Sequence, residues 1–121
     1  MKALFDTNIL IDYLNGILAA KKELALYRTH AISIITWMEV LAGCAVEEQD
    51  ITRKFLAGFE IIPLDEAIAA RAVTLRRTQR MKLPDAIILA SAVSNSLSLV
   101  TRNIKDFDKA MPGIRVPYQV K

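Results

Sequence analysis

Five polar side chains in this sequence have the types and spacing needed to bind a hard metal ion. Each follows a predicted strand or opens a predicted helix, namely Asp6, Glu39, Asp85, Asn103 and Asp106. Ligands of open parallel sheets bind beyond the carboxyl ends of the strands, so we expect these residues to meet at one edge. Clustered carboxylates repel each other unless a cation joins them. A divalent ion held there would lower the pKa of a bound water and prepare it for attack.

The donor types favour Mg²⁺, with Mn²⁺ as an alternative, over zinc. Carboxylate and amide oxygens are the ligands that hard divalent ions prefer, whereas zinc prefers nitrogen and sulfur. The sequence has one histidine and one cysteine. His30 precedes a predicted strand and Cys44 follows a predicted helix, so they do not make a zinc set.

Three of the acids also have an ordinary structural interpretation. Asp6 begins an Asp-Thr-Asn turn, and Glu39 stands third after Thr36, as in a capping box that opens a helix near Thr36. Asp85 lies in a first helical turn, where the helix dipole favours an acid, lowers its pKa and keeps it ionised. Each interpretation suffices for its residue alone, but the gathering of all these acids at one sheet edge favours a functional site.

The elements that must position these residues alternate between short apolar runs and longer helical patterns. We expect strands at residues 2–5, 31–35, 59–64, 97–100 and 114–116, and helices at 9–14, 18–27, 36–43, 46–58, 65–80, 84–95 and about 104–109. Because the strands show no polar alternation, both of their faces are expected to be buried. The predicted fold is a three-layer α/β/α domain with a central, mostly parallel β-sheet.

Composition limits the classes to which the chain can belong. Its 121 residues, 53% hydrophobic and 24% charged, predict a single globular domain over residues 1–121 and exclude disorder as the main state. The single cysteine suits a reducing cytosol, and we expect a cytoplasmic protein. Asp6 interrupts the N-terminal apolar run before a signal-peptide core develops, and the most apolar stretch, residues 86–93, is about half a membrane crossing. No membrane partner is expected.

Four segments, taken in order, resemble a known family. They are FDTNILID at residues 5–12, WMEV at 37–40, LPDAIILA at 83–90 and LVTRNIKDF at 99–107. The segments are similar to the ordered motifs of PIN domains, specifically the VapC-type toxins of toxin–antitoxin pairs. The resemblance spans nearly the whole chain.

That resemblance implies a Mg²⁺-dependent endoribonuclease whose acidic site is formed by Asp6, Glu39 and Asp85, with the metal ion held chiefly by Asp6 and Asp85. It also implies a cytoplasmic homodimer that is inhibited by a small antitoxin. One position departs from the family pattern, because Asn103 stands where many members carry a fourth acid. Asp106, three residues on, can supply the missing charge.

For a nuclease with these motifs, cations must hold the RNA against the carboxylates. No acid occurs at residues 67–84, a stretch that contains five cations and leads into Asp85. We expect RNA phosphates to bind the cations nearest the acids, which are Arg80, Lys82, Arg102 and Lys105. The formal net charge of +3 conceals this separation of acids from cations.

Two other classes remain open. A small phosphoryl-transfer domain, either a receiver or a phosphatase, would need a second acid after Asp6, where Thr7 and Asn8 stand, and a receiver would also need a suitably placed lysine. A non-catalytic PIN-fold module that binds RNA or a protein would keep the fold and the basic face, with Asn103 marking decay of the site.

Overall fold

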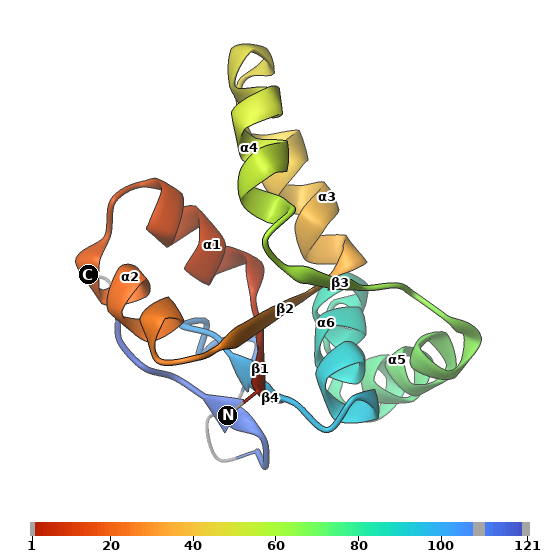
Figure 1. The fold of residues 1–121 in the computed structure, drawn as a ribbon. Coiled ribbons are helices and arrows are strands. Elements are labelled where there is room, and N and C mark those ends of the chain that lie inside the picture. The colour runs from red at the N-terminus through yellow and green to blue at the C-terminus, as the bar shows by residue number, and fades with distance from the viewer. Residues whose placement is uncertain (1, 108–110, 120–121) are drawn as a thin grey trace.

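The structure, a computed structural model, describes residues 2–107 and 111–119, which form one parallel sheet and its covering helices (Figure 1). The strands are β1 (Lys2–Phe5), β2 (Thr29–Ser33), β3 (Glu60–Ile62), β4 (Ser98–Val100) and β5 (Ile114–Arg115). The helices are α1 (Thr7–Leu14), α2 (Leu18–Ala25), α3 (Ile34–Gly43), the short 3-10 helix η1 (Val46–Glu48), α4 (Gln49–Leu56), α5 (Glu66–Gln79) and α6 (Leu83–Ser94).

The sheet has the order β3-β2-β1-β4-β5, and all of its pairings are parallel. β1 lies in the centre, where Leu4 is in register with Ala31 of β2 and Leu99 of β4. Successive side chains of a strand point to opposite faces, and Ala3, Leu4 and Phe5 are all buried. Both faces of the central strand are therefore covered, as the apolar runs predict.

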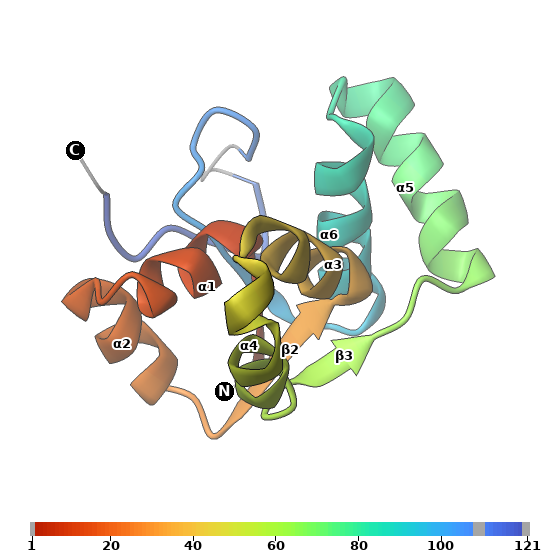
Figure 2. The same cartoon turned by 90° about the horizontal axis from the view of Figure 1, so that it is seen from above.

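Helices cover the two faces of the sheet in separate groups (Figures 1 and 2). α5 and α6 pack on the face that carries Leu4 and Leu99, and the buried side chain of Phe107 joins this core. α1 to α4 pack on the face that carries Phe5 and Val100. The predicted three-layer α/β/α class is confirmed, with a sheet that is parallel throughout the described residues.

The start of α3 differs from the prediction. The helix begins at Ile34, and Ser33 caps it by accepting a hydrogen bond from the amide of Ile35 at 3.1 Å. The predicted capping box at Thr36 is therefore wrong, because Thr36 is a buried interior residue of the helix and Glu39 lies well past its first turn. Ser33, the last residue of the strand, is a better helix start than a threonine three residues later.

The predicted bounds of two further helices are also wrong. The one at 46–58 is divided into η1 and α4. Residues 104–106, predicted as helical, form a turn, and residues 108–110 lie outside the described part of the chain. Of the helices that the structure describes, none has the length and apolar character needed to cross a membrane.

Candidate active site

Asp6 directly follows β1 and caps the start of α1. Its Oδ1 accepts a hydrogen bond from the amide of Thr7 at 2.8 Å, and its Oδ2 accepts one from the Thr101 hydroxyl at 2.7 Å. The Asn8 amide also donates to Oδ2, at 3.2 Å. Burial raises the pKa of Asp6, and the hydrogen bonds from Thr101, Thr7 and Asn8 oppose that rise. The structural and functional interpretations of Asp6 are thus compatible, since the turn fixes the orientation of the carboxylate.

Glu39 reaches this region from α3. The Thr7 hydroxyl donates to Glu39 Oε1 at 2.7 Å, and the Thr36 hydroxyl lies 3.0 Å from that of Thr7. Glu39 is exposed, whereas Asp6 is 4% exposed. The negative charge of Glu39 nevertheless contributes to the raised pKa of Asp6. One hydroxyl therefore connects the first residue of α1 to the acid on α3.

Asp85 lies in the first turn of α6, after Pro84, and is partly buried. Burial is the main cause that raises its pKa to about 6, and the negative charges of Asp106, Asp6 and Glu39 add to the rise, as does a hydrogen bond with Asp106. The lowered pKa that the helix dipole predicts is wrong. The dipole favours the anion only modestly, and here desolvation and like charges outweigh it.

Asn103 and Asp106 form one turn after β4. The Asn103 amide donates to Asp106 Oδ2 at 2.6 Å, and its Oδ1 accepts from the backbone amides of Lys105 and Asp106 at 3.2 and 3.3 Å. This pattern is an Asx turn, in which an asparagine side chain replaces a backbone turn. Asn103 thereby holds the carboxylate of Asp106, and the charge of that carboxylate contributes to the raised pKa of Asp85.

The four acids come from four separate segments, and the charges of the others contribute to the raised pKa values of Asp6 and Asp85. Within residues 2–107 and 111–119, however, no three His, Cys, Asp or Glu side chains form a ready-made metal-ligand cluster. Asp6, Glu39 and Asp106 instead accept hydrogen bonds from neighbouring side chains or backbone amides. His30 and Cys44 are elsewhere, bound to the carbonyls of Leu24 and Leu41 respectively.

Comparison with known proteins identifies the family. The model of the PIN domain matches residues 3–110 of the sequence. The chain belongs to the PIN domain family. A relative of this PIN domain, ribonuclease VapC10 of Mycobacterium tuberculosis, is 32% identical, and the match covers 94% of each chain.

Solved structures similar to this PIN domain include toxin–antitoxin complexes. A chain of a toxin–antitoxin complex from Klebsiella pneumoniae has 49% identity and a TM-score of 0.92, with 98% of this chain and 99% of that chain covered. A chain of VapBC2 from Rickettsia felis, bound to a DNA fragment from the promoter, has 26% identity and a TM-score of 0.74, with 94% and 96% covered.

The cations expected near the acids of this PIN domain fall into two groups. Arg80, Lys82 and Lys105 are exposed. Arg80 ends α5 in a left-handed conformation with φ of 55°, and the link to α6 is tied down by Arg76, whose Nη1 donates to the Met81 carbonyl at 3.0 Å. Arg102 differs, because its guanidinium is engaged by another side chain of the domain, Asp12.

Several residues that organise the PIN-domain site were not predicted from the sequence. Thr7, Asn8 and Thr101 hold the carboxylate of Asp6, and Thr7 also holds Glu39. Their signal is present in the Asp-Thr-Asn and Thr-Arg-Asn triplets, whose uncharged members carry the needed hydroxyl and amide groups. The hydrogen bonds that Asp12 accepts from Arg102 and Tyr118 were not predicted, since they depend on the folded chain.

Proposed function

We propose that this PIN domain is a metal-dependent endoribonuclease and the toxin of a toxin–antitoxin pair. The observation that carries the proposal is the gathering of acids from separate segments of the chain. Thr7 donates hydrogen bonds to both Asp6 and Glu39, and burial together with the charges of Asp106, Asp6 and Glu39 raises the pKa of Asp85 to about 6. Active sites are where burial and like charges are arranged to shift pKa values in this way. The relative named ribonuclease VapC10 supports the same reaction class.

The donor set fits Mg²⁺ or Mn²⁺. All of the converging groups are carboxylates or an amide. Burial is the main cause of the raised pKa of Asp85, and a divalent cation would remove the repulsion that adds to it. Asp6 and Asp85 would hold the ion, and Asp106 and Asn103 are the candidates for an outer or second position. When bound, the ion supplies positive charge against the phosphate and makes water easier to deprotonate.

The remaining chemistry belongs to side chains of the protein. Glu39 would orient the attacking water and accept its proton, and the hydrogen bond from Thr7 to Oε1 restrains the orientation of the Glu39 carboxylate. The bonds to Asp6 from Thr101 and the Thr7 amide hold that carboxylate in one orientation before RNA arrives. Arg80, Lys82 and Lys105 are exposed cations suited to the RNA phosphates.

The nuclease test uses structured RNAs with Mg²⁺ or Mn²⁺ and with EDTA. We expect cleavage that EDTA abolishes and that Asp6→Asn and Asp85→Asn each lower by at least about 100-fold. Asp50→Asn is the matched control, because Asp50 is an exposed acid on α4. Equal cleavage by the wild type and both site variants would identify a contaminant. Metal-independent RNA binding without cleavage would instead favour the non-catalytic module.

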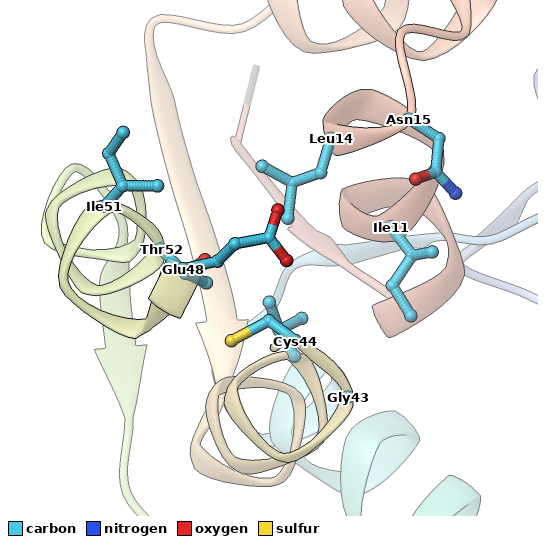
Figure 3. A pocket seen from close by; sticks show the side chains of 9 residues that line it. Ile11, Leu14, Asn15, Gly43, Cys44, Glu48, Ile51 and Thr52 are labelled. Carbon is cyan, nitrogen blue, oxygen red and sulfur yellow. The ribbon is translucent and has the colours of Figure 1, made fainter. Parts of the chain in front are cut away.

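A groove between α1, α3 and α4 supports an antitoxin partner. It has a volume of about 330 Å³, and Ile11 and Leu14 of α1 border it opposite Cys44 and Glu48 (Figure 3). Ile11 and Leu14 are 39% and 44% exposed. Glu48 is the one charged residue among those lining the groove. An apolar segment of the antitoxin with one basic residue matches this lining.

Binding of the antitoxin is tested by co-expression with the product of a neighbouring small reading frame. We expect Leu14→Asp to weaken co-purification strongly, because a carboxylate would be buried in an apolar contact. Leu18→Asp is the control, since Leu18 is an exposed leucine on α2 outside the groove. Equal loss with both variants would place the partner elsewhere or indicate a general folding defect.

The proposal includes a homodimer that acts in the cytosol. Large apolar side chains stay exposed on α3, α5 and α6, among them Met38, Val73, Leu83 and Val93, and a second copy can cover such residues. A single cysteine fits a reducing compartment. Sedimentation velocity is the measurement, and a monomer at all accessible concentrations would contradict the dimer.

A further inference from the structure

Arg102 stands beside the candidate acids in sequence, but its guanidinium binds a carboxylate on α1. Nε donates to Asp12 Oδ2 at 2.5 Å and Nη2 donates to Asp12 Oδ1 at 3.0 Å. The side chain of Asp12 is 6% exposed and that of Arg102 is 31% exposed. A paired contact of this kind restricts direction as well as distance. The charge of Arg102 is therefore used within the chain.

A third segment completes this contact. The Tyr118 hydroxyl donates to Asp12 Oδ2 at 2.8 Å, so that Asp12 accepts from both Arg102 and Tyr118. The buried carboxylate thereby ties the loop after β4 to α1 and to the segment that follows β5. We call the side chains of Asp12, Arg102 and Tyr118 the Asp12 clamp.

The residues on either side of Arg102 contact the site. Thr101 donates to Asp6 Oδ2 at 2.7 Å and accepts from the Asn103 backbone amide at 3.0 Å. Asn103 in turn donates to Asp106 at 2.6 Å. A change in the backbone at Arg102 would therefore be transmitted to two acids, one on each side.

We propose that Arg102 is a positioning residue, whose paired hydrogen bonds to Asp12 hold the 101–106 loop so that Asp6 and Asp106 keep their places at the site. The inference rests on the proposed nuclease function. It assigns Arg102 a different role from Arg80, Lys82 and Lys105, which are exposed. Turning Arg102 toward a phosphate would leave the buried carboxylate of Asp12 without its cation, which is costly.

The test compares Arg102→Lys, which keeps the charge but loses the paired geometry, with Asp12→Asn, which keeps the shape but loses the charge. We expect each to lower kcat for RNA cleavage about 10- to 100-fold, because small displacements of reacting groups are costly. KM and its salt dependence should stay within about twofold of the wild type, since no RNA contact is removed. Arg28→Lys, at an exposed arginine between α2 and β2, is the matched control.

The double variant Asp12→Asn/Arg102→Lys should be no slower than the slower single variant, because both substitutions break one contact. The smaller change Tyr118→Phe removes one hydroxyl and should lower kcat about two- to fivefold by the same route. A raised KM with unchanged kcat in Arg102→Lys, with Asp12→Asn unaffected, would overturn the proposal and assign Arg102 to RNA.

Hydrogen exchange provides a readout that does not require activity. We expect the amides of residues 103–107 to exchange faster in Arg102→Lys and Asp12→Asn, with unchanged exchange in β1 and β2. If the wild type cleaves no RNA, the proposed function fails. The exchange measurement still tests whether the Asp12 clamp holds the loop. Unchanged exchange at residues 103–107 in both variants would refute it.

Discussion

The Thr7 hydroxyl donates to Glu39 Oε1 over 2.7 Å and so connects the first turn of α1 to the side of α3. The backbone amide of the same threonine donates to Asp6 Oδ1. Thr7 thus orients two of the acids. Its backbone amide orients Asp6, and its side-chain hydroxyl orients Glu39.

Replacing Thr7 should separate these two functions. Thr7→Val removes the hydroxyl and keeps the amide, so we expect kcat for RNA cleavage to fall about tenfold through loss of the Glu39 contact. Thr7→Ser keeps the hydroxyl and should restore most of the activity. Single-turnover cleavage measures both, and a Thr7→Val enzyme as fast as the wild type would show that Glu39 needs no such support.

Asp85 should destabilise the metal-free protein as the pH rises. Its pKa is raised from 3.8 to about 6, so the folded state binds this proton more tightly than the unfolded state does. The free energy of unfolding therefore falls as the pH rises from 3.8 to about 6, and it remains at the lower value at neutral pH. Asp85→Asn should raise the free energy of unfolding at neutral pH by roughly 1–3 kcal/mol without metal.

The measurement is urea unfolding of both proteins in EDTA, from about pH 4 to about pH 7, where the gap should widen with pH. Added Mg²⁺ should stabilise the wild type more than Asp85→Asn, since the ion binds the folded carboxylates. A gap that does not change with pH would mean that Asp85 ionises normally.

Asn103 and Asp106 allow a test of the departure from the family pattern. Asp106→Asn should weaken Mn²⁺ binding about tenfold in calorimetry, because it removes a charge that acts on Asp85. Asn103→Asp should strengthen it, since the amide that donates to Asp106 is replaced by a second carboxylate. Asp50→Asn is again the control. An unchanged Mn²⁺ affinity in Asp106→Asn would mean that Asp106 only stabilises the turn and does not contribute to metal binding.

A second ion pair predicts acid sensitivity away from the site. Arg115 donates to both oxygens of the buried Glu23 at 2.7 and 3.0 Å, and Tyr27 donates at 2.9 Å. Burial alone would raise the pKa of Glu23, but these bonds and the Arg115 charge lower it overall below its ordinary 4.5. The stabilisation is thus present above pH 4.5 and is lost as the pH falls through the lowered pKa of the folded state.

We expect Glu23→Gln to cost about 1–2 kcal/mol near neutral pH, because charged hydrogen bonds are replaced while the exposed Arg115 is solvated. The difference from the wild type should shrink at about pH 3, when Glu23 takes up a proton. Chemical unfolding at the two pH values checks this. A difference that is the same at both would assign the effect to packing.

The fold was predictable because apolar runs and caps are local. The strand at Lys2–Phe5, the Asp65 cap of α5 and the Pro84 start of α6 all occur as predicted. The start of α3 could not be predicted, because Ser33 and Thr36 are both suitable N-cap residues. In the folded chain Thr36 is buried and Ser33 caps the helix. The pKa of Asp85 was not predictable either, since it depends on acids brought near by the fold.

The central position of β1 also has a consequence for synthesis. Asp6 depends on Thr101, which lies 95 residues later, and β1 pairs with β4 only when residues 98–100 are available. Contacts between residues so far apart in sequence form late in folding, and synthesis is slow compared with local folding. A nascent chain whose residues 98–101 are still within the ribosome has neither its fourth strand nor the hydroxyl that orients Asp6. In the proposed toxin, translation itself would delay activity until these residues have emerged, close to the ribosomes and RNA among which the protein is made.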